Sequence, residues 1–275
     1  MKAVEIKKVG LVGWPVKHSI SPALHNACFR YLKLPYEYGL YGIEPCNFDS
    51  EIRELKKNLA GFNVTVPHKE RVMKYLDDIN GEASSIGAVN TVKKEFGKWK
   101  GYNTDAVGFL RSIKEDINPR GLNAFVLGAG GAAKAVSSAL AGSGVGKIYV
   151  KDIDVEKSKV LRARIIKHFP ATQIILADGF QALVNCGILV NATPVGMEDD
   201  SIPIPEEFLY NHLYVFDCVY NRKTPLIKKA ERVGLKCRGG LNMLIYQASE
   251  AFKIWTGLTA PLEVMRKAAI EEMGG

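Results

Sequence analysis

The fold of this chain is decided by the stretch FVLGAGGAA at residues 125–133. An apolar run ends there in a glycine-rich turn, and small residues then open a helix. Gly128, Gly130 and Ala133 occupy the three positions of the G-x-G-x-x-[G/A] pattern. Gly128 permits a tight turn, Gly130 lets a pyrophosphate approach the main chain, and the helix start offers free N–H groups to phosphate oxygens. The stretch therefore predicts a strand, turn and helix that bind a dinucleotide.

A second apolar run, residues 147–150, ends just before Asp152. The dinucleotide pattern asks for an acidic residue about 20 positions after the glycines, where it accepts hydrogen bonds from the adenosine ribose. Asp152 is the candidate for this role. The alternative is a strand–helix turn that binds no ligand.

Composition limits the remaining possibilities. The chain has 275 residues, of which 47% are hydrophobic, enough for two ordinary domains or one large one. No apolar run approaches the ~20 residues of a membrane span, and Met1–Lys8 lacks the apolar stretch of a signal peptide. The five cysteines are odd in number and lack C-x-x-C spacing, which indicates reduced thiols. We expect a cytoplasmic protein.

Charge gives a weaker signal. Lys and Arg total 37 against 29 Asp and Glu, a net charge of +8. Nucleic-acid binding is one interpretation. The basic residues are spread along the chain, however, which favours a solvated surface with a weak attraction for anions. We expect neither a nucleic-acid nor a membrane partner. The protein is expected to be a monomer or a homodimer.

Apolar runs alternate with helical patterns along most of the chain, which predicts an α/β fold with two domains. We expect a substrate-binding and catalytic domain at 1–105, a dinucleotide-binding Rossmann domain at 106–238, and C-terminal helices at 239–275 that return to the first domain. In the first domain, Ser21 is the expected N-cap of a helix. Strands are expected at 9–13, 36–43, 61–66 and 88–92, helices at 48–59 and 69–76, and a hairpin turn at 97–101.

Uncharged polar side chains follow several predicted strands, where α/β folds bind ligands. Hydroxyl and amide groups of this kind suit a ligand rich in hydroxyl groups. Lys69 and Asp105 are the obvious pair for proton transfer among them. Each residue also has an ordinary structural interpretation: Ser19 and Ser21 as helix caps, Lys69 as an exposed helix-start residue, Asp105 as an N-cap.

Eight motifs, taken together, resemble those of the shikimate dehydrogenase family and its shikimate/quinate relatives. They run in order from Ser19 to Ala248: SISP, NVTVPHK, GAVNT, GYNTDAVGF, LGAGGAAKA, NATPVGM, DCVYN and GGLNMLIYQA. The resemblance implies a Rossmann domain beside an α/β substrate domain. It also implies reversible oxidation of the ring 3-hydroxyl of shikimate to 3-dehydroshikimate by hydride transfer to a nicotinamide cofactor, a step of aromatic amino-acid biosynthesis.

The resemblance assigns substrate roles by matching position. It implies that Ser19 and Ser21 hold the substrate carboxylate, that Asp105 binds ring hydroxyls, and that Lys69 is the catalytic acid/base. The Asp105 carboxylate also has the right chemistry to orient this lysine. The other residues that the resemblance places at the substrate are Asn63, Thr65, Asn90, Tyr220 and Gln247.

The resemblance also implies a cofactor site and no metal. The pyrophosphate would lie on the main chain of Gly128, Ala129, Gly130, Gly131 and Ala132. The nicotinamide half would contact Thr193, Cys218 and Gly240.

The chain departs from the family after the second strand of the Rossmann domain. Many members have Asn-Arg-Thr there, and the arginine clamps the 2′-phosphate of NADP. This chain has Asp152-Ile153-Asp154. Ile153 cannot pair with a phosphate, and two carboxylates would repel one. The sequence therefore predicts a preference for NAD, with NADP as the alternative; Lys151 and Lys157 are the nearby side chains that could reach a phosphate.

Other functions stay open at this point. An NAD preference favours a quinate/shikimate dehydrogenase of quinate breakdown as an alternative. Another two-domain dehydrogenase with a catalytic lysine, of the methylene-tetrahydrofolate type, is a second. A nucleotide-sensing protein without catalysis is the alternative from a different class.

Overall fold

The computed structural model describes residues 5–274. The first four residues of Met1–Lys8 and the last residue of the predicted 239–275 segment lie outside that range. The described chain separates into two compact units. Unit 1 contains the residues up to Thr104 together with those from Ile245 onwards, and unit 2 runs from Asp105 to Leu244. The second change of unit falls inside helix α8 (Leu241–Thr256).

Unit 1 is built on a six-stranded mixed sheet with the order β2-β1-β3-β5-β6-β4. The β1 strand pairs in parallel with β2 and β3, whereas β5 runs antiparallel to β3 and β6. The elements are β1 Lys7–Gly13, α1 Ser21–Tyr31, β2 Tyr36–Gly42, α2 Phe48–Asn58, β3 Gly61–Val64, η1 Arg71–Tyr75, β4 Asp78–Ile79, α3 Gly81–Ile86, β5 Thr91–Glu95, β6 Lys98–Tyr102, the later part of α8, and α9 Leu262–Gly274.

Three local expectations for unit 1 differ from the structure. The N-cap of α1 is Ile20, and Ser21 is instead the first helical residue. The segment expected to be helical at 69–76 forms only the short 3₁₀ turn η1. Strand β5 starts at Thr91, later than expected, and the N–H of Val89 before it bonds to the carbonyl of Lys69 rather than to a neighbouring strand.

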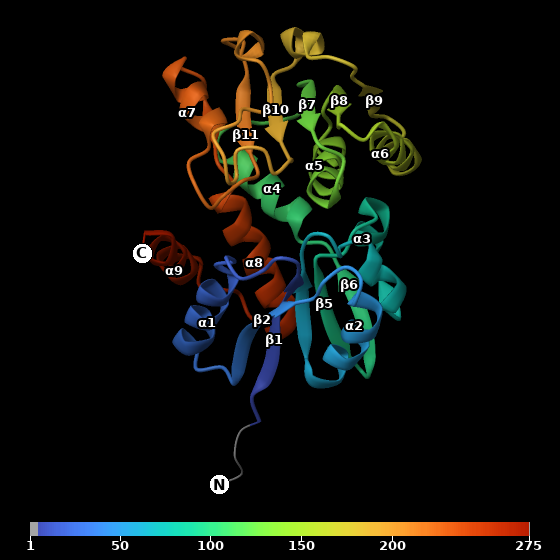
Figure 1. Ribbon diagram of the computed structural model, residues 1–275, viewed down its shortest axis with the longest axis vertical. Coiled ribbons are helices and arrows are strands. Elements are labelled where there is room, and N and C mark those ends of the chain that lie inside the picture. Colours follow the sequence, from blue (N-terminus) through green and yellow to red (C-terminus); the bar gives the residue numbers. More distant parts are fainter. Residues whose placement is uncertain (1–4, 275) are drawn as a thin grey trace. The chain divides into compact units, whose positions relative to one another are not determined.

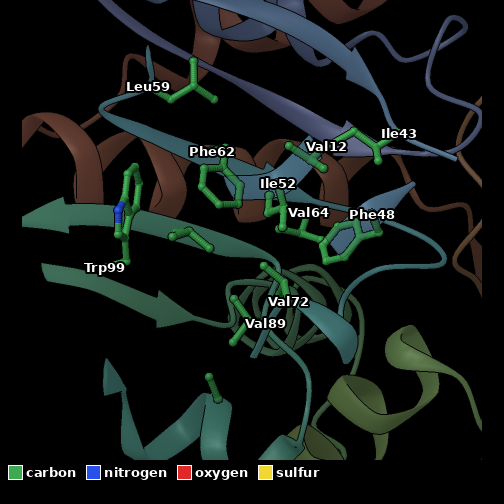
Figure 2. Packing of buried hydrophobic residues seen from close by; sticks show 12 residues of the cluster. Val12, Ile43, Phe48, Ile52, Leu59, Phe62, Val64, Val72, Val89 and Trp99 are labelled. Atoms are coloured by element: carbon green, nitrogen blue, oxygen red, sulfur yellow. The ribbon is translucent and has the colours of Figure 1, made fainter. Parts of the chain in front are cut away.

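The core of unit 1 fills both faces of its sheet. On one face, strand residues such as Phe62 and Val64 pack against Phe48 and Ile52 of α2 (Figure 2). On the other face lies an aromatic group that includes His25 and Phe29 of α1 and Phe252 and Trp255 of α8. Helix α1 lies beside α9 there (Figure 1).

Unit 2 is a parallel sheet with the strand order β12-β11-β10-β7-β8-β9 (Figure 1). The order reverses between β7 and β10, and α/β sheets bind ligands at such a reversal, beyond the carboxyl ends of the strands. Its elements are α4 Asp105–Lys114, β7 Ala124–Leu127, α5 Gly131–Gly142, β8 Lys147–Lys151, α6 Val155–His168, β9 Gln173–Leu176, η2 Gln181–Asn185, β10 Ile188–Asn191, η3 Glu206–Phe208, β11 Tyr214–Asp217, α7 Pro225–Arg232, β12 Cys237–Arg238 and the start of α8. The predicted α/β class with a Rossmann domain is confirmed.

Among the described residues, no helix is both long and apolar enough to span a membrane.

Candidate active site

Two loops at the carboxyl edge of the unit 1 sheet bring predicted substrate residues near one another in the fold. The loop after β1 carries Ser19 and Ser21, and the loop after β3 carries Thr65. The N–H of Trp14 bonds to the carbonyl of Val66 at 3.0 Å and joins the two loops. The Ser19 hydroxyl donates to Ser21 Oγ at 3.1 Å and accepts the Ser21 N–H at 3.3 Å. Ser19 Oγ therefore accepts the N–H of the first helical residue of α1, although the N-cap itself is Ile20.

A buried polar cluster lies farther along the same edge. Both side-chain N–H groups of Asn63 are used, one toward the Asn90 carbonyl at 3.1 Å and one toward Thr91 Oγ1 at 2.9 Å. Asn63 Oδ1 accepts the hydroxyl of Tyr38 at 2.8 Å. Asn63 and Asn90 are nearly inaccessible to solvent, with exposed fractions of 6% and 2%. Asn63 therefore fixes the Asn90–Thr91 segment as well as lining this edge.

The cluster continues through Asn90 to Thr104. The amide of Asn90 donates to Thr104 Oγ1 at 2.9 Å, and its oxygen accepts the Thr104 N–H at 2.8 Å. Thr104 Oγ1 lies 3.4 Å from Gln247 Oε1, so the α8 residue predicted to reach this site is placed at it. Sequence reasoning did not assign roles to Tyr38, Thr91 and Thr104. The consecutive polar residues in GAVNT and GYNTD were the available signal for the two threonines.

Lys69 and His68 follow the third strand. Lys69 is half-buried, and its carbonyl holds the N–H of Val89. His68 is buried against Phe48, with ring centroids 4.2 Å apart, and its Nε2 lies 2.7 Å from the Ile43 carbonyl. Desolvation lowers the pKa of His68, which keeps the ring neutral. This agrees with a structural histidine beside the lysine.

In unit 2 the glycine-rich turn has the geometry that its pattern requires. Gly128 has φ +98°, a left-handed conformation, and a Cβ there would lie 3.0 Å from the carbonyl oxygen of Ala192. Gly130 is the N-cap of α5, and a Cβ added to it would meet no protein atom within 4 Å. The main chain at Gly130 therefore faces open space at the start of a helix, which fits a bound pyrophosphate.

The Asp152 carboxylate holds this turn in place. Its Oδ2 accepts the N–H of Ala129 at 2.6 Å, and its Oδ1 accepts the N–H of Asp154 at 2.8 Å. Asp154 caps α6 by accepting the N–H groups of Glu156 and Lys157. Ile153 is fully exposed between them.

Two further loops follow β10 and β11. Thr193 comes two residues after β10, Cys218 directly follows β11, and the N–H of Gly240 bonds to the Val219 carbonyl at 2.9 Å. A Cβ on Gly240 would lie 2.3 Å from the Cys218 carbonyl oxygen, so only glycine fits. The remaining predicted residues are Asp105, buried at the first position of α4, and Tyr220, half-buried after β11. Within residues 5–274, no group of three His, Cys, Asp or Glu side chains could hold a metal ion.

Comparison with known proteins identifies the family. A model described as the shikimate dehydrogenase substrate binding domain matches residues 11–92, and one described as the shikimate 5′-dehydrogenase C-terminal domain matches residues 240–270. The chain is 41% identical to the shikimate dehydrogenase (NADP(+)) of Methanopyrus kandleri, over 98% of this chain and 97% of that protein. The chain belongs to the shikimate dehydrogenase family. The family expected from the eight motifs is thus confirmed.

Solved structures of shikimate dehydrogenases share this fold over nearly the whole chain. One in complex with NADP+ is 40% identical with a TM-score of 0.90, covering 98% of this chain and 96% of the other. The enzyme from Thermus thermophilus, in complex with NADP(H) and shikimate, is 34% identical with a TM-score of 0.87, covering 97% and 100%.

The predicted preference for NAD is wrong. Several shikimate dehydrogenases similar to this chain are named for NADP(+), and the solved structure with a TM-score of 0.90 contains NADP+. The prediction treated Asp152 and Asp154 as free carboxylates facing a phosphate. In the structure both accept main-chain N–H groups, and Lys157 Nζ lies 3.4 Å from Asp154 Oδ2. The main-chain donors stabilise both carboxylates and turn them toward the protein, and the Lys157 ammonium offsets part of the Asp154 charge, so repulsion of a phosphate is weaker than assumed.

Proposed function

We propose that this chain interconverts shikimate and 3-dehydroshikimate with NADP(H), as a step of the shikimate pathway. The observation that carries the proposal is similarity over nearly the full length to enzymes of that name. The closely spaced hydroxyl and amide side chains at the carboxyl edge of the unit 1 sheet also support the proposal, because such groups suit a small polyhydroxy acid.

The substrate carboxylate is assigned to the paired hydroxyls of Ser19 and Ser21, with Thr65 on the adjoining loop. Ring hydroxyls are assigned to the Asn90 and Gln247 end of the buried cluster. Because the Asn63 amide is already bonded on both sides, its main role is to hold Asn90 and Thr91 in place. Tyr220 and Asp105 are also assigned to the substrate.

Lys69 is assigned the proton transfer. An ammonium placed at the reacting oxygen stabilises developing negative charge there and supplies the proton for reduction of the ketone; the amine takes the proton back in oxidation. Asp105 is assigned to orient this amine.

The cofactor is assigned to the glycine turn of unit 2. The open space at Gly130 fits a pyrophosphate on the main chain of residues 128–132, and the loops after β10 and β11 flank the nicotinamide half. Bound at this turn, NADP+ would supply the acceptor for the hydride of the carbinol carbon. Side chains and main chain of this protein bind and orient both reactants.

An assay with paired substrates and cofactors tests the function. Purified protein is mixed with shikimate or quinate and with NADP+ or NAD+, and the nicotinamide absorbance is followed. We expect the highest kcat/KM for shikimate with NADP+. Turnover of quinate alone would assign the protein to quinate metabolism. NADPH binding without turnover of either acid would indicate a nucleotide sensor.

A further inference from the structure

A buried carboxylate–amide pair joins the two loops at the carboxyl ends of β10 and β11. Asn191 is the last residue of β10 and Asp217 the last of β11, and the two are direct neighbours in the parallel ladder. Asn191 Nδ2 donates to Asp217 Oδ1 at 3.0 Å. Both residues are 0% exposed. Neither was assigned a role in the sequence analysis.

Asp217 is held by neutral donors. Its Oδ1 also accepts the N–H of Val219 at 3.0 Å, and its Oδ2 accepts the hydroxyl of Thr224 at 2.7 Å. Within residues 5–274, no Lys, Arg or His forms an ion pair with this carboxylate. A buried acidic group without a cationic partner is costly to the fold, as its pKa, raised by burial to about 6, indicates. Packing alone does not explain a carboxylate at this buried position.

The Asp217 carboxylate acts on the orientation of the Asn191 amide. Asn191 Oδ1 accepts both the N–H of Thr193, at 3.1 Å, and its hydroxyl, at 2.6 Å. An asparagine amide can present either its oxygen or its NH₂ group in a given direction. Nδ2 donates to Asp217 and, at 3.3 Å, to the Val195 carbonyl, so the oxygen is the atom left to face Thr193. Asp217, together with the Val195 carbonyl, thereby sets the conformation of the loop that begins at Thr193.

The same pair also fixes the neighbouring loop. The main-chain carbonyl of Asn191 accepts the N–H of Cys218 at 2.8 Å, and Asp217 Oδ1 holds the N–H of Val219. Thr193 and Cys218, the two residues assigned to the nicotinamide half, therefore both depend on contacts made by Asn191 and Asp217.

We propose that Asp217 is a positioning residue for the cofactor: through Asn191 it orders the Thr193 loop and the Cys218–Val219 main chain that flank the nicotinamide. This inference rests on the proposed function. Asp217 does not touch the reacting atoms, and its effect is to be seen in cofactor affinity rather than in shikimate affinity.

The first test compares alanine variants at two aspartates of unit 2, the buried Asp217 and the half-buried Asp116. In Asp217→Ala the Asn191 amide loses the shorter of its two acceptor contacts and keeps only the Val195 carbonyl at 3.3 Å. The Kd for NADPH, measured by titration calorimetry, should rise on the order of tenfold. The shikimate KM at saturating NADP+ should change less than twofold. Asp116→Ala removes a carboxylate bonded to Arg238 and Tyr214. It should lower the melting temperature and leave the NADPH Kd unchanged. In Asp217→Asn one oxygen can still accept from Asn191, so NADPH affinity should largely return.

Exchanging the amide and the carboxylate between positions 191 and 217 provides an independent test if Asp217→Ala does not fold. Asn191→Asp places two carboxylates against each other and should weaken NADPH binding. The double variant Asn191→Asp with Asp217→Asn removes one of the two facing carboxylates and so relieves their repulsion, although the NH₂ group at position 217 then also faces the Val219 N–H. Its NADPH affinity should exceed that of Asn191→Asp alone.

Three results would overturn the positioning role while leaving the proposed function intact: unchanged NADPH affinity in folded Asp217→Ala, equal weakening in Asp116→Ala, or no recovery in the double variant. Failure of the wild-type protein to bind NADPH or to oxidise shikimate would instead remove the proposed function.

Discussion

The imidazole of His25 and the phenol ring of Tyr38 stack face to face, with ring centroids 4.5 Å apart and planes 3° from parallel. His25 is fully buried, and neither of its ring nitrogens has a hydrogen-bond partner among the described residues. The hydroxyl of Tyr38 donates to Asn63 at 2.8 Å. The aromatic core of unit 1 therefore directly supports the polar cluster assigned to the substrate.

The buried imidazole makes stability depend on pH. Desolvation lowers the pKa of His25 from 6.5 to about 3. Below pH 6.5 the unfolded chain takes up a proton that the folded protein does not, so the free energy of unfolding falls by about 1.4 kcal/mol per pH unit from this residue.

His25→Phe keeps an aromatic ring in the stack and removes this loss. We expect its stability relative to wild type, from urea unfolding, to increase by about 2 kcal/mol between pH 7.5 and pH 5. His168, which is exposed, provides the control: His168→Asn should leave the wild-type slope unaltered. Equal slopes for His25→Phe and wild type would contradict the assignment of this effect to His25.

Two glycines of the dinucleotide turn should respond differently to alanine. At Gly130, φ is −75° and a Cβ meets open space, so Gly130→Ala should keep the wild-type melting temperature and lose NADPH affinity because the methyl group occupies the path of the pyrophosphate. At Gly128, φ is +98° and a Cβ would press on Ala192, so Gly128→Ala should lose about 1–3 kcal/mol of stability. Calorimetry of unfolding and of NADPH binding measures both. Wild-type NADPH affinity in Gly130→Ala would argue against a pyrophosphate at this turn.

Lys69→Ala should lower kcat by about 10²–10⁴-fold, the usual contribution of a general acid or base, with NADPH binding retained. The exposed Lys74 offers a matched control on the adjoining turn, and Lys74→Ala should keep kcat within a factor of about 2 of wild type. Steady-state kinetics with shikimate and NADP+ measure both variants. Near-normal turnover in Lys69→Ala would exclude this residue as the proton donor.

Asn63→Asp changes almost no volume and removes two N–H donors. A carboxylate at this position would face the Asn90 carbonyl and Thr91 Oγ1, which are 3.1 and 2.9 Å from the present nitrogen. We expect a loss of about 1–3 kcal/mol of stability and a higher shikimate KM, with no change in the NADPH Kd. Tyr38→Phe, which removes only one hydroxyl from the cluster, should have a smaller effect in the same direction. An unchanged shikimate KM in Asn63→Asp would separate the cluster from the substrate site.

The sequence was sufficient to predict structural features that depend on short local patterns. The FVLGAGGAA stretch predicted β7, the turn and α5, and polar residues after strands indicated the edge where Asn63, Asn90 and Thr104 meet. The sequence could not show which hydrogen-bond partner each polar side chain would have in the folded protein. Asp152 was expected to face a cofactor as a free carboxylate, yet its oxygens bind the N–H groups of Ala129 and Asp154. Asn191 and Asp217 lie 26 residues apart, and only the pairing of β10 with β11 makes them neighbours.

Unit 1 is assembled from two separate stretches of chain, and the later stretch supplies structural contacts. Trp255 donates its indole N–H to the Val92 carbonyl at 3.0 Å, and its own carbonyl accepts the Tyr36 hydroxyl at 3.2 Å. Synthesis therefore completes the two units in the reverse of the order in which it begins them. All of unit 2 has been made once Leu244 is added, whereas the unit 1 sheet gains its last covering helices only with residues 245–274.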